Sequence, residues 1–138
     1  MEFDSYKYLS YTEMRSKLFV LAETYYRYMK LTTASEKYGI KHRVNCENEK
    51  PCEVDVVLIT DVNSDNDNKK QVYISGALHG DEVIGPNVAY YLIEYILMSA
   101  KDKTIERLLS NMEIIVTPMT NAVGYYHKER EERLSNEA

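Results

Sequence analysis

The sequence has no excess of basic residues: 17 lysines and arginines stand against 22 aspartates and glutamates, a formal net charge of −5. We therefore expect no nucleic-acid-binding surface, because no basic stripe is available to meet phosphates. No apolar run reaches the length that a bilayer-spanning helix needs. The first residues also lack the basic and apolar regions of a secretory signal peptide, although that absence carries no information on a longer parent protein.

Tryptophan is absent as well, whereas tyrosine occurs 13 times. Tyrosine clusters at residues 25–28 and 90–95 can pack by their rings and keep their hydroxyls near water, so we interpret them as amphipathic helix faces. No internal repeat or low-complexity segment is present. With 138 residues and 44% hydrophobic content, the chain is predicted to form one globular domain, residues 1–138, with a real core.

The chain is organised around residues 72–98, which we interpret as a buried strand, a tight turn and a helix. Val-Tyr-Ile at the start has the composition of a strand. Gly76 and Gly80 allow a sharp chain reversal after it. Pro86 suits the first turn of a helix, and apolar residues then recur at helical spacing. The turn is thus placed at the C-terminal end of a strand, where open α/β sheets bind their ligands.

The turn carries an imidazole and a carboxylate, His79 and Glu82. They supply one nitrogen and one oxygen donor a few residues apart, as a catalytic zinc site with an open position needs. A bare His-x-x-Glu is a weak pattern, and a hydrogen-bonded histidine at a turn is the usual alternative. The flanking glycines, the strand before and the helix after favour the metal pair. We therefore predict His79 and Glu82 as metal ligands and give Asp81 no ligand role.

The segment Gly-Ala-Leu-His-Gly-Asp-Glu at residues 76–82 resembles the first zinc-binding motif of the zinc carboxypeptidases, or metallocarboxypeptidases. Downstream, residues 114–125 resemble the family's strand that ends in Pro-x-x-Asn-Pro-Asp-Gly-Tyr, with Ala122 and Val123 in place of the usual Pro-Asp. The order and separation of the two motifs also fit the family. The resemblance extends from about Tyr8 onward, and the first fifty residues match in pattern only.

The resemblance implies an α/β fold: a mixed, mostly parallel twisted sheet with helices on both faces, present here in incomplete form. It also implies a zinc-dependent peptidase that releases C-terminal amino acids from peptides or proteins, with His79 and Glu82 holding the metal. The family's third zinc ligand, its Asn-Arg pair for the substrate carboxylate and its glutamate base would lie beyond Ala138. We therefore expect no catalytic residue within this chain, and little or no peptidase activity from the chain alone.

Two other functions stay open. A zinc-dependent acyl-amino-acid hydrolase of the aspartoacylase or succinylglutamate desuccinylase type also uses Gly-x-His-Gly-x-Glu, although the motif around Asn121 favours the peptidase. A non-catalytic binding fragment with a vestigial metal site is the second alternative. We do not expect His42 or His127 to supply a missing ligand, and we interpret Arg130 and Arg133 as part of a charged tail.

Cys46 and Cys52 flank a polar turn. At this separation they can close a small disulfide loop, which would indicate an oxidising compartment and the secretory route. Two free thiols are the alternative. A zinc pair is disfavoured, because structural zinc prefers a shorter spacing and needs two more ligands nearby.

The remaining pattern predicts conventional elements. Helical periodicity after a capping box at Ser10 predicts a helix over residues 11–30. A right-handed crossover should leave the strand at 112–117 parallel to the strand of the central motif. The other expected elements are strands at 38–45 and 54–60, a solvated hairpin connection at 61–70 with calcium as a remote alternative, a short helix at 105–109 ended by a left-handed Asn111, and a charged tail at 125–138.

Overall fold

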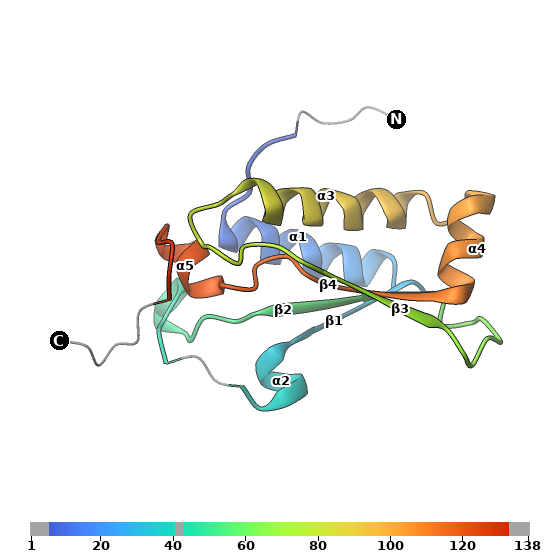
Figure 1. Ribbon diagram of the computed structural model, residues 1–138, viewed down its shortest axis with the longest axis horizontal. Helices are drawn as coiled ribbons and strands as arrows, with labels where there is room; N and C mark the ends of the chain where they lie inside the picture. Colours follow the sequence, from blue (N-terminus) through green and yellow to red (C-terminus); the bar gives the residue numbers. More distant parts are fainter. Residues whose placement is uncertain (1–5, 41–42, 133–138) are drawn as a thin grey trace.

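The computed structural model describes residues 6–40 and 43–132, which form a mixed sheet with helices on both faces (Figure 1). The strands lie in the order β1-β2-β4-β3. β3 and β4 are parallel, whereas β1 and β4 each pair with β2 in antiparallel orientation. The strands are β1 (Met29–Thr33), β2 (Asp55–Ile59), β3 (Lys70–Ser75) and β4 (Met112–Thr117). The helices are α1 (Tyr11–Thr24), α2 (Ala34–Tyr38), the 3₁₀ turn η1 (Glu47–Glu49), α3 (Ile84–Met98), α4 (Lys103–Asn111) and α5 (Ala122–His127).

The core lies between the sheet and the helix pair α1 and α3, which run side by side over one face (Figure 1). Arg15 of α1 donates to the carboxylate of Asp55 in β2, so Asp55 faces the helices. Alternate strand residues share a face, and Val57 and Ile59 are accordingly fully buried on the same side. The other side of the sheet carries α2 beside β1 (Figure 1).

The α/β fold with a mixed sheet is confirmed, but the parallel share is smaller than expected. Within the described residues, β3 with β4 is the parallel pair, as the strand–helix–strand pattern predicted. The predicted strands at 54–60 and 112–117 are also confirmed, as β2 and β4. The strand of the central motif is β3, but its predicted burial is wrong, because β3 is an edge strand and most of its residues are exposed. β2 is buried along nearly its whole length, because it lies between β1 and β4 in the sheet.

The helix predicted over residues 11–30 begins where expected but ends early. Ser10 caps it, its hydroxyl accepting from the backbone N–H of Glu13 at 3.1 Å. Helix α1 stops at Thr24, and Met29 and Lys30 begin β1 instead. Met29 is buried at 2% exposure in the sheet. Met29 would be buried whether it lay in a helix or in a strand, so apolar periodicity alone could not show that the helix ends before it.

The strand predicted at 38–45 is wrong for the residues that the structure describes. Tyr38 ends α2, a short helix with a complete capping box at Thr33 and Glu36, and Gly39 closes it in the left-handed conformation at φ +70°. Asn45 makes only an isolated bridge to Pro51. Residues 41–42, which include His42, lie outside the described part.

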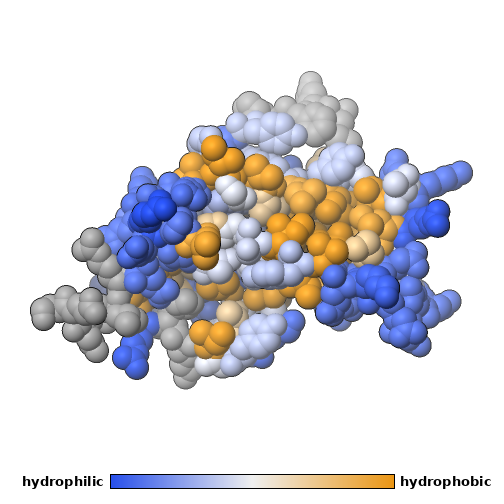
Figure 2. Space-filling model, in the orientation of Figure 1, coloured by the Kyte–Doolittle hydropathy of each residue, from blue (hydrophilic) through white to orange (hydrophobic). Residues whose placement is uncertain are grey.

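Helix α4 is longer than the predicted 105–109 and ends at Asn111 without a left-handed residue, because Met112 continues directly into β4 in extended conformation. The tail prediction is also wrong in part, since residues 122–127 form α5. Residues 133–138 lie outside the described part. Figure 2 shows apolar residues gathered over the middle of the molecule and hydrophilic residues at both ends.

The hairpin predicted at 61–70 is wrong, because β4 lies between β2 and β3. The loop is anchored at its start by an ion pair between buried Asp61 and half-exposed Arg27. Asp61 is 4% exposed, and both of its carboxylate oxygens accept from Arg27, at 3.0 and 2.9 Å. Donation from Arg27 lowers the pKa of Asp61. This carboxylate is satisfied by protein groups, so the structure offers no support for a calcium site there.

Asp61→Asn should therefore lower stability at neutral pH and lose much of that effect in acid. A carboxylate whose pKa is lower in the folded state stabilises the fold above its unfolded pKa of about 3.9, and this contribution disappears as pH falls through the folded value. Urea unfolding of both proteins near pH 7 and at about pH 3 measures the difference. Asp67→Asn, an exposed carboxylate of the same loop, is the control for loss of one negative charge. A difference that does not shrink in acid would contradict this account.

Candidate metal centre

The turn after β3 is fixed by backbone contacts with the segment that follows β4. The N–H of Gly76 donates to Thr117 O at 3.0 Å, and the N–H groups of Thr120 and Asn121 donate back to Gly76 O and Ala77 O. A Cβ on Gly76 would lie 2.4 Å from Pro118 O. Glycine is thus required here for two chain segments to approach, and the second sequence motif supports the first.

His79 and Glu82 lie side by side on this turn. Nδ1 of His79 is 3.4 Å from Oε1 of Glu82, and the N–H of Glu82 donates to His79 O. Their side chains are 37% and 61% exposed, so both lie at the protein surface. Two donors that share one tetrahedral zinc ion at about 2.0–2.1 Å each lie about 3.4 Å apart. The spacing and the nitrogen–oxygen donor set therefore fit a zinc ion.

Arg130 also reaches this pair, which the sequence did not predict. Its Nη1 lies 3.2 Å from Oε1 of Glu82 and 3.6 Å from Oδ1 of Asp81. Its backbone oxygen accepts from the N–H of Gly80 at 3.0 Å. The segment assigned to a charged tail thus returns to the turn and adds a positive charge beside the two carboxylates. Asp81 is exposed, as expected.

Helix α5 packs directly behind the turn through two glycines. A Cβ on Gly80 would lie 2.2 Å from the carbonyl carbon of Gly124 and 2.4 Å from Glu129 O. Asn121 caps α5, its Oδ1 accepting from the N–H of Gly124 at 2.8 Å, and its Nδ2 donates to Arg130 O at 3.3 Å. Asn121 thus shapes this loop through hydrogen bonds of its side chain to backbone groups. The same contacts explain how Arg130 is brought back.

A groove of about 540 Å³ opens beside the turn, between the N-terminal end of α1 and α5. Tyr8, Tyr11 and Tyr126 contribute rings to its lining, and Lys128 contributes a cation. Burial raises the pKa of Tyr11, whose hydroxyl accepts from the N–H of Glu53. The groove reaches Gly80 and Asp81, so it opens directly beside the turn that carries His79 and Glu82.

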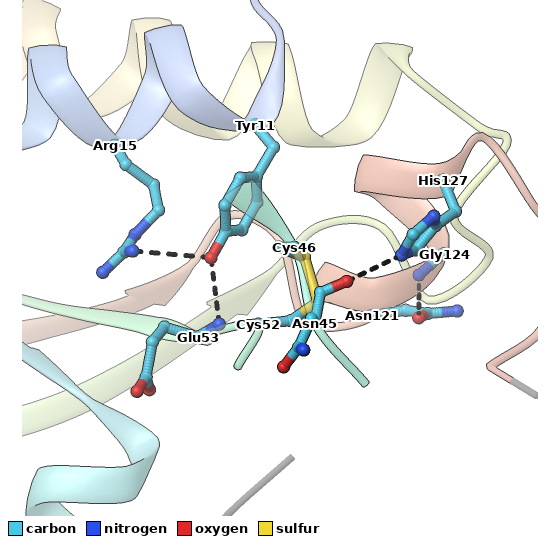
Figure 3. Close-up of a disulfide and its surroundings, with 9 residues drawn as sticks. All are labelled: Tyr11, Arg15, Asn45, Cys46, Cys52, Glu53, Asn121, Gly124 and His127. Atoms are coloured by element: carbon cyan, nitrogen blue, oxygen red, sulfur yellow. Dashed lines mark hydrogen bonds between the residues drawn. A yellow bond between two sulfur atoms is a disulfide. The ribbon is translucent and has the colours of Figure 1, made fainter. Parts of the chain in front are cut away.

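The two cysteines form a disulfide, as predicted, with an S–S distance of 2.02 Å (Figure 3). His127 lies next to it, and its Nε2 donates to Asn45 O at 3.0 Å. Within residues 6–40 and 43–132, Cys46, Cys52 and His127 are the one group of three potential metal ligands. Because the sulfurs are bonded to each other, this group is not a metal site in the oxidised protein, and no third ligand of this kind joins His79 and Glu82 in the described residues.

Comparison with solved structures finds carboxypeptidases. The chain is similar to thrombin-activatable fibrinolysis inhibitor, with 20% identity and a TM-score of 0.71 over 95% of this chain and 31% of that chain. It is similar to carboxypeptidase A from Helicoverpa armigera, with 19% identity and a TM-score of 0.73 over 96% and 30% of the two chains. A putative carboxypeptidase from Burkholderia mallei matches at 14% identity and a TM-score of 0.62, over 86% and 27%.

These likenesses concern the fold, and the chain spans about a third of the length of the first two structures. No curated protein sequence matches at a significant level. The family model described as zinc carboxypeptidase matches residues 23–138, which include both sequence motifs and every residue of the turn. The chain belongs to the zinc carboxypeptidase family.

Proposed function

We propose that this chain supplies two ligands, His79 and Glu82, to the catalytic zinc of a carboxypeptidase that releases C-terminal amino acids from peptides or proteins. The observation that carries the proposal is the 3.4 Å separation of the two donor atoms on a glycine-bounded turn at the end of β3. Zinc held there would polarise the scissile carbonyl and activate a water molecule. The family match favours a peptidase over the acyl-amino-acid hydrolases that share the first motif.

Arg130 would have a second role beside the metal pair. In the structure its guanidinium neutralises the carboxylates of Glu82 and Asp81. A metal that engaged Glu82 would leave these donors free to bind a carbonyl oxygen of the substrate that gains negative charge beside the turn. A fixed guanidinium at such a position stabilises the charge, because its donors are already oriented. The backbone contact of Arg130 to Gly80 holds it within reach.

The chain alone is proposed to lack part of the site. By the family pattern, the third zinc ligand, the base that accepts the water's proton and the clamp for the substrate carboxylate come from outside these 138 residues. Two ligands hold zinc weakly and leave the water without a base. The purified chain with added zinc should therefore release little or no C-terminal amino acid from a blocked peptide. Robust turnover that His79→Ala abolishes would overturn this part of the proposal.

The activity itself is tested in a longer protein in which this chain is joined to a third ligand and a base. Such a protein should release the last residue of a peptide with a blocked N-terminus, lose that activity on chelation and regain it with zinc. His79→Ala should abolish the activity, whereas Asp81→Asn should retain it. Hydrolysis of N-acyl amino acids without any release from peptides would contradict the carboxypeptidase proposal.

We also infer that the chain works in an oxidising compartment, on the secretory route or outside the cell. The support is the Cys46–Cys52 disulfide, since such bonds persist in oxidising environments. No helix in the described residues is long and apolar enough to cross a membrane.

A further inference from the structure

The loop closed by the disulfide is held together by backbone hydrogen bonds across it. The N–H of Cys46 donates to Lys50 O at 2.8 Å, and the N–H of Cys52 donates to Val44 O at 3.0 Å. Both cysteines are buried, at 7% and 1% exposure. The loop therefore presents its backbone at a fixed place, including the carbonyl oxygen of Asn45.

Helix α5 is attached to this loop at its last residue. Nε2 of His127 donates to Asn45 O, which comes from a segment 82 positions earlier (Figure 3). The ring of Tyr126 meets that of Tyr11 edge to face, at 5.5 Å between centroids. A helix of six residues is too short to be stable by itself, so tertiary contacts determine where α5 lies. Its first turn is held by buried Ala122 and Val123, whereas its exposed last residue is held by the bond of His127 to Asn45 O.

The other side of α5 supports the metal turn. Gly80, the residue between His79 and Asp81, has no room for a Cβ, because one would lie 2.2 Å from the carbonyl carbon of Gly124. A Cβ on Gly124 would in turn lie 2.6 Å from Glu129 O. The N–H of Glu129 donates to Gly124 O, and the N–H of Gly80 donates to Arg130 O. A contact path therefore runs from the disulfide loop through His127 and α5 to the turn.

We propose that His127, held by the disulfide-closed loop, is a positioning residue for the metal turn: it fixes α5 behind Gly80 and so keeps His79 and Glu82 at metal-binding separation. The zinc-affinity part of its test rests on the proposed function, because it requires that His79 and Glu82 bind zinc. It assigns His127 no contact with metal or substrate, because its ring is engaged by Asn45. It also gives the Cys46–Cys52 disulfide a task beyond stabilising its own loop.

The test compares His127→Ala with His127→Gln in the 138-residue chain. The amide of glutamine can still donate to Asn45 O, whereas alanine cannot. We expect zinc affinity, measured by calorimetry, to fall about tenfold in His127→Ala, the lower range for losing a group that orients a ligand. Hydrogen exchange of residues 76–85 should rise in the same variant. His127→Gln should restore both values.

Asp61→Asn is the matched control for general destabilisation, because its ion pair lies in a different loop and touches neither the turn nor α5. It should lower stability and leave zinc affinity unchanged. Unchanged zinc affinity and unchanged exchange in His127→Ala would overturn the proposal. Equal losses in the alanine and glutamine variants would overturn it too, because the hydrogen bond would then not be the cause.

The contribution of the disulfide is tested with the double variant Cys46→Ser/Cys52→Ser. Chemical reduction is avoided, because free thiols beside His127 could bind the metal themselves. The double serine variant should reproduce the effects of His127→Ala, and adding His127→Ala to it should cause little further loss. Fully additive losses would show that the loop and His127 act separately, against the proposal. If the chain bound no zinc at all, the prediction that His79 and Glu82 alone can hold the ion would fail, while the exchange of residues 76–85 would still report on the positioning path.

Discussion

His79→Ala is expected to abolish zinc binding by the chain, with an affinity loss of more than about 100-fold, the upper range for losing a group that only orients a ligand. The imidazole is one of two donors, and Glu82 alone cannot hold the ion against water. Glu82→Gln should have a similar effect, because an amide oxygen lacks the charge of the carboxylate. Calorimetric titration of zinc into each purified variant measures the loss.

Asp81→Asn is the matched control for the metal pair. Asp81 lies one residue from Glu82 and meets the same arginine, at 3.6 Å, yet it is not assigned as a ligand. Its variant should bind zinc nearly as well as the unmodified chain. Retained binding in His79→Ala, or loss of binding in Asp81→Asn with His79 intact, would show that the ligands have been assigned wrongly.

Gly80→Ala is expected to have the largest effect on the fold around the site. The added methyl group would meet backbone atoms of Gly124 and Glu129 at 2.2 and 2.4 Å, and backbone cannot rotate away as a side chain can. Either the turn or α5 must move, at a cost of about 3 kcal/mol, the upper end of what overpacking usually costs. Urea unfolding measures this cost, and zinc titration should show the accompanying loss of affinity.

Gly85→Ala provides the control within the same motif. A Cβ at Gly85 would lie 3.8 Å from Ala77 N, an ordinary contact, and the residue is helical. This variant should be as stable as the unmodified chain or slightly more stable, because alanine is the better helix former by about 1 kcal/mol. If Gly80→Ala and Gly85→Ala behaved alike, close packing behind the turn would not be what demands glycine at position 80.

The sequence predicted the parts of the fold that local chemistry determines. The glycines around His79 and the periodic helix after Pro86 each indicate one conformation, and β3, the turn and α3 follow them. The antiparallel pairings of β2 were not predicted, because strand composition does not specify a neighbour. Met29 shows the same limit, since its burial suits a helix face as well as a strand.

The site could be predicted from the sequence only as far as its ligand pair. His79 and Glu82 belong to one short motif, so their proximity follows from local geometry. Arg130 lies 48 positions away from Glu82, in a charged segment without periodicity. Its return depends on the backbone contacts of Gly80 and Gly124, which no local pattern encodes. The link between His127 and Asn45 spans 82 positions and was missed for the same reason.

The central claim is that one zinc ion binds between His79 and Glu82. Anomalous diffraction at the zinc absorption edge, from crystals of the zinc-loaded chain, locates the ion directly. The account predicts a single strong peak about 2.0–2.2 Å from both Nδ1 of His79 and a carboxylate oxygen of Glu82. A peak beside His127, or an ion held without either of the two predicted ligands, would contradict it.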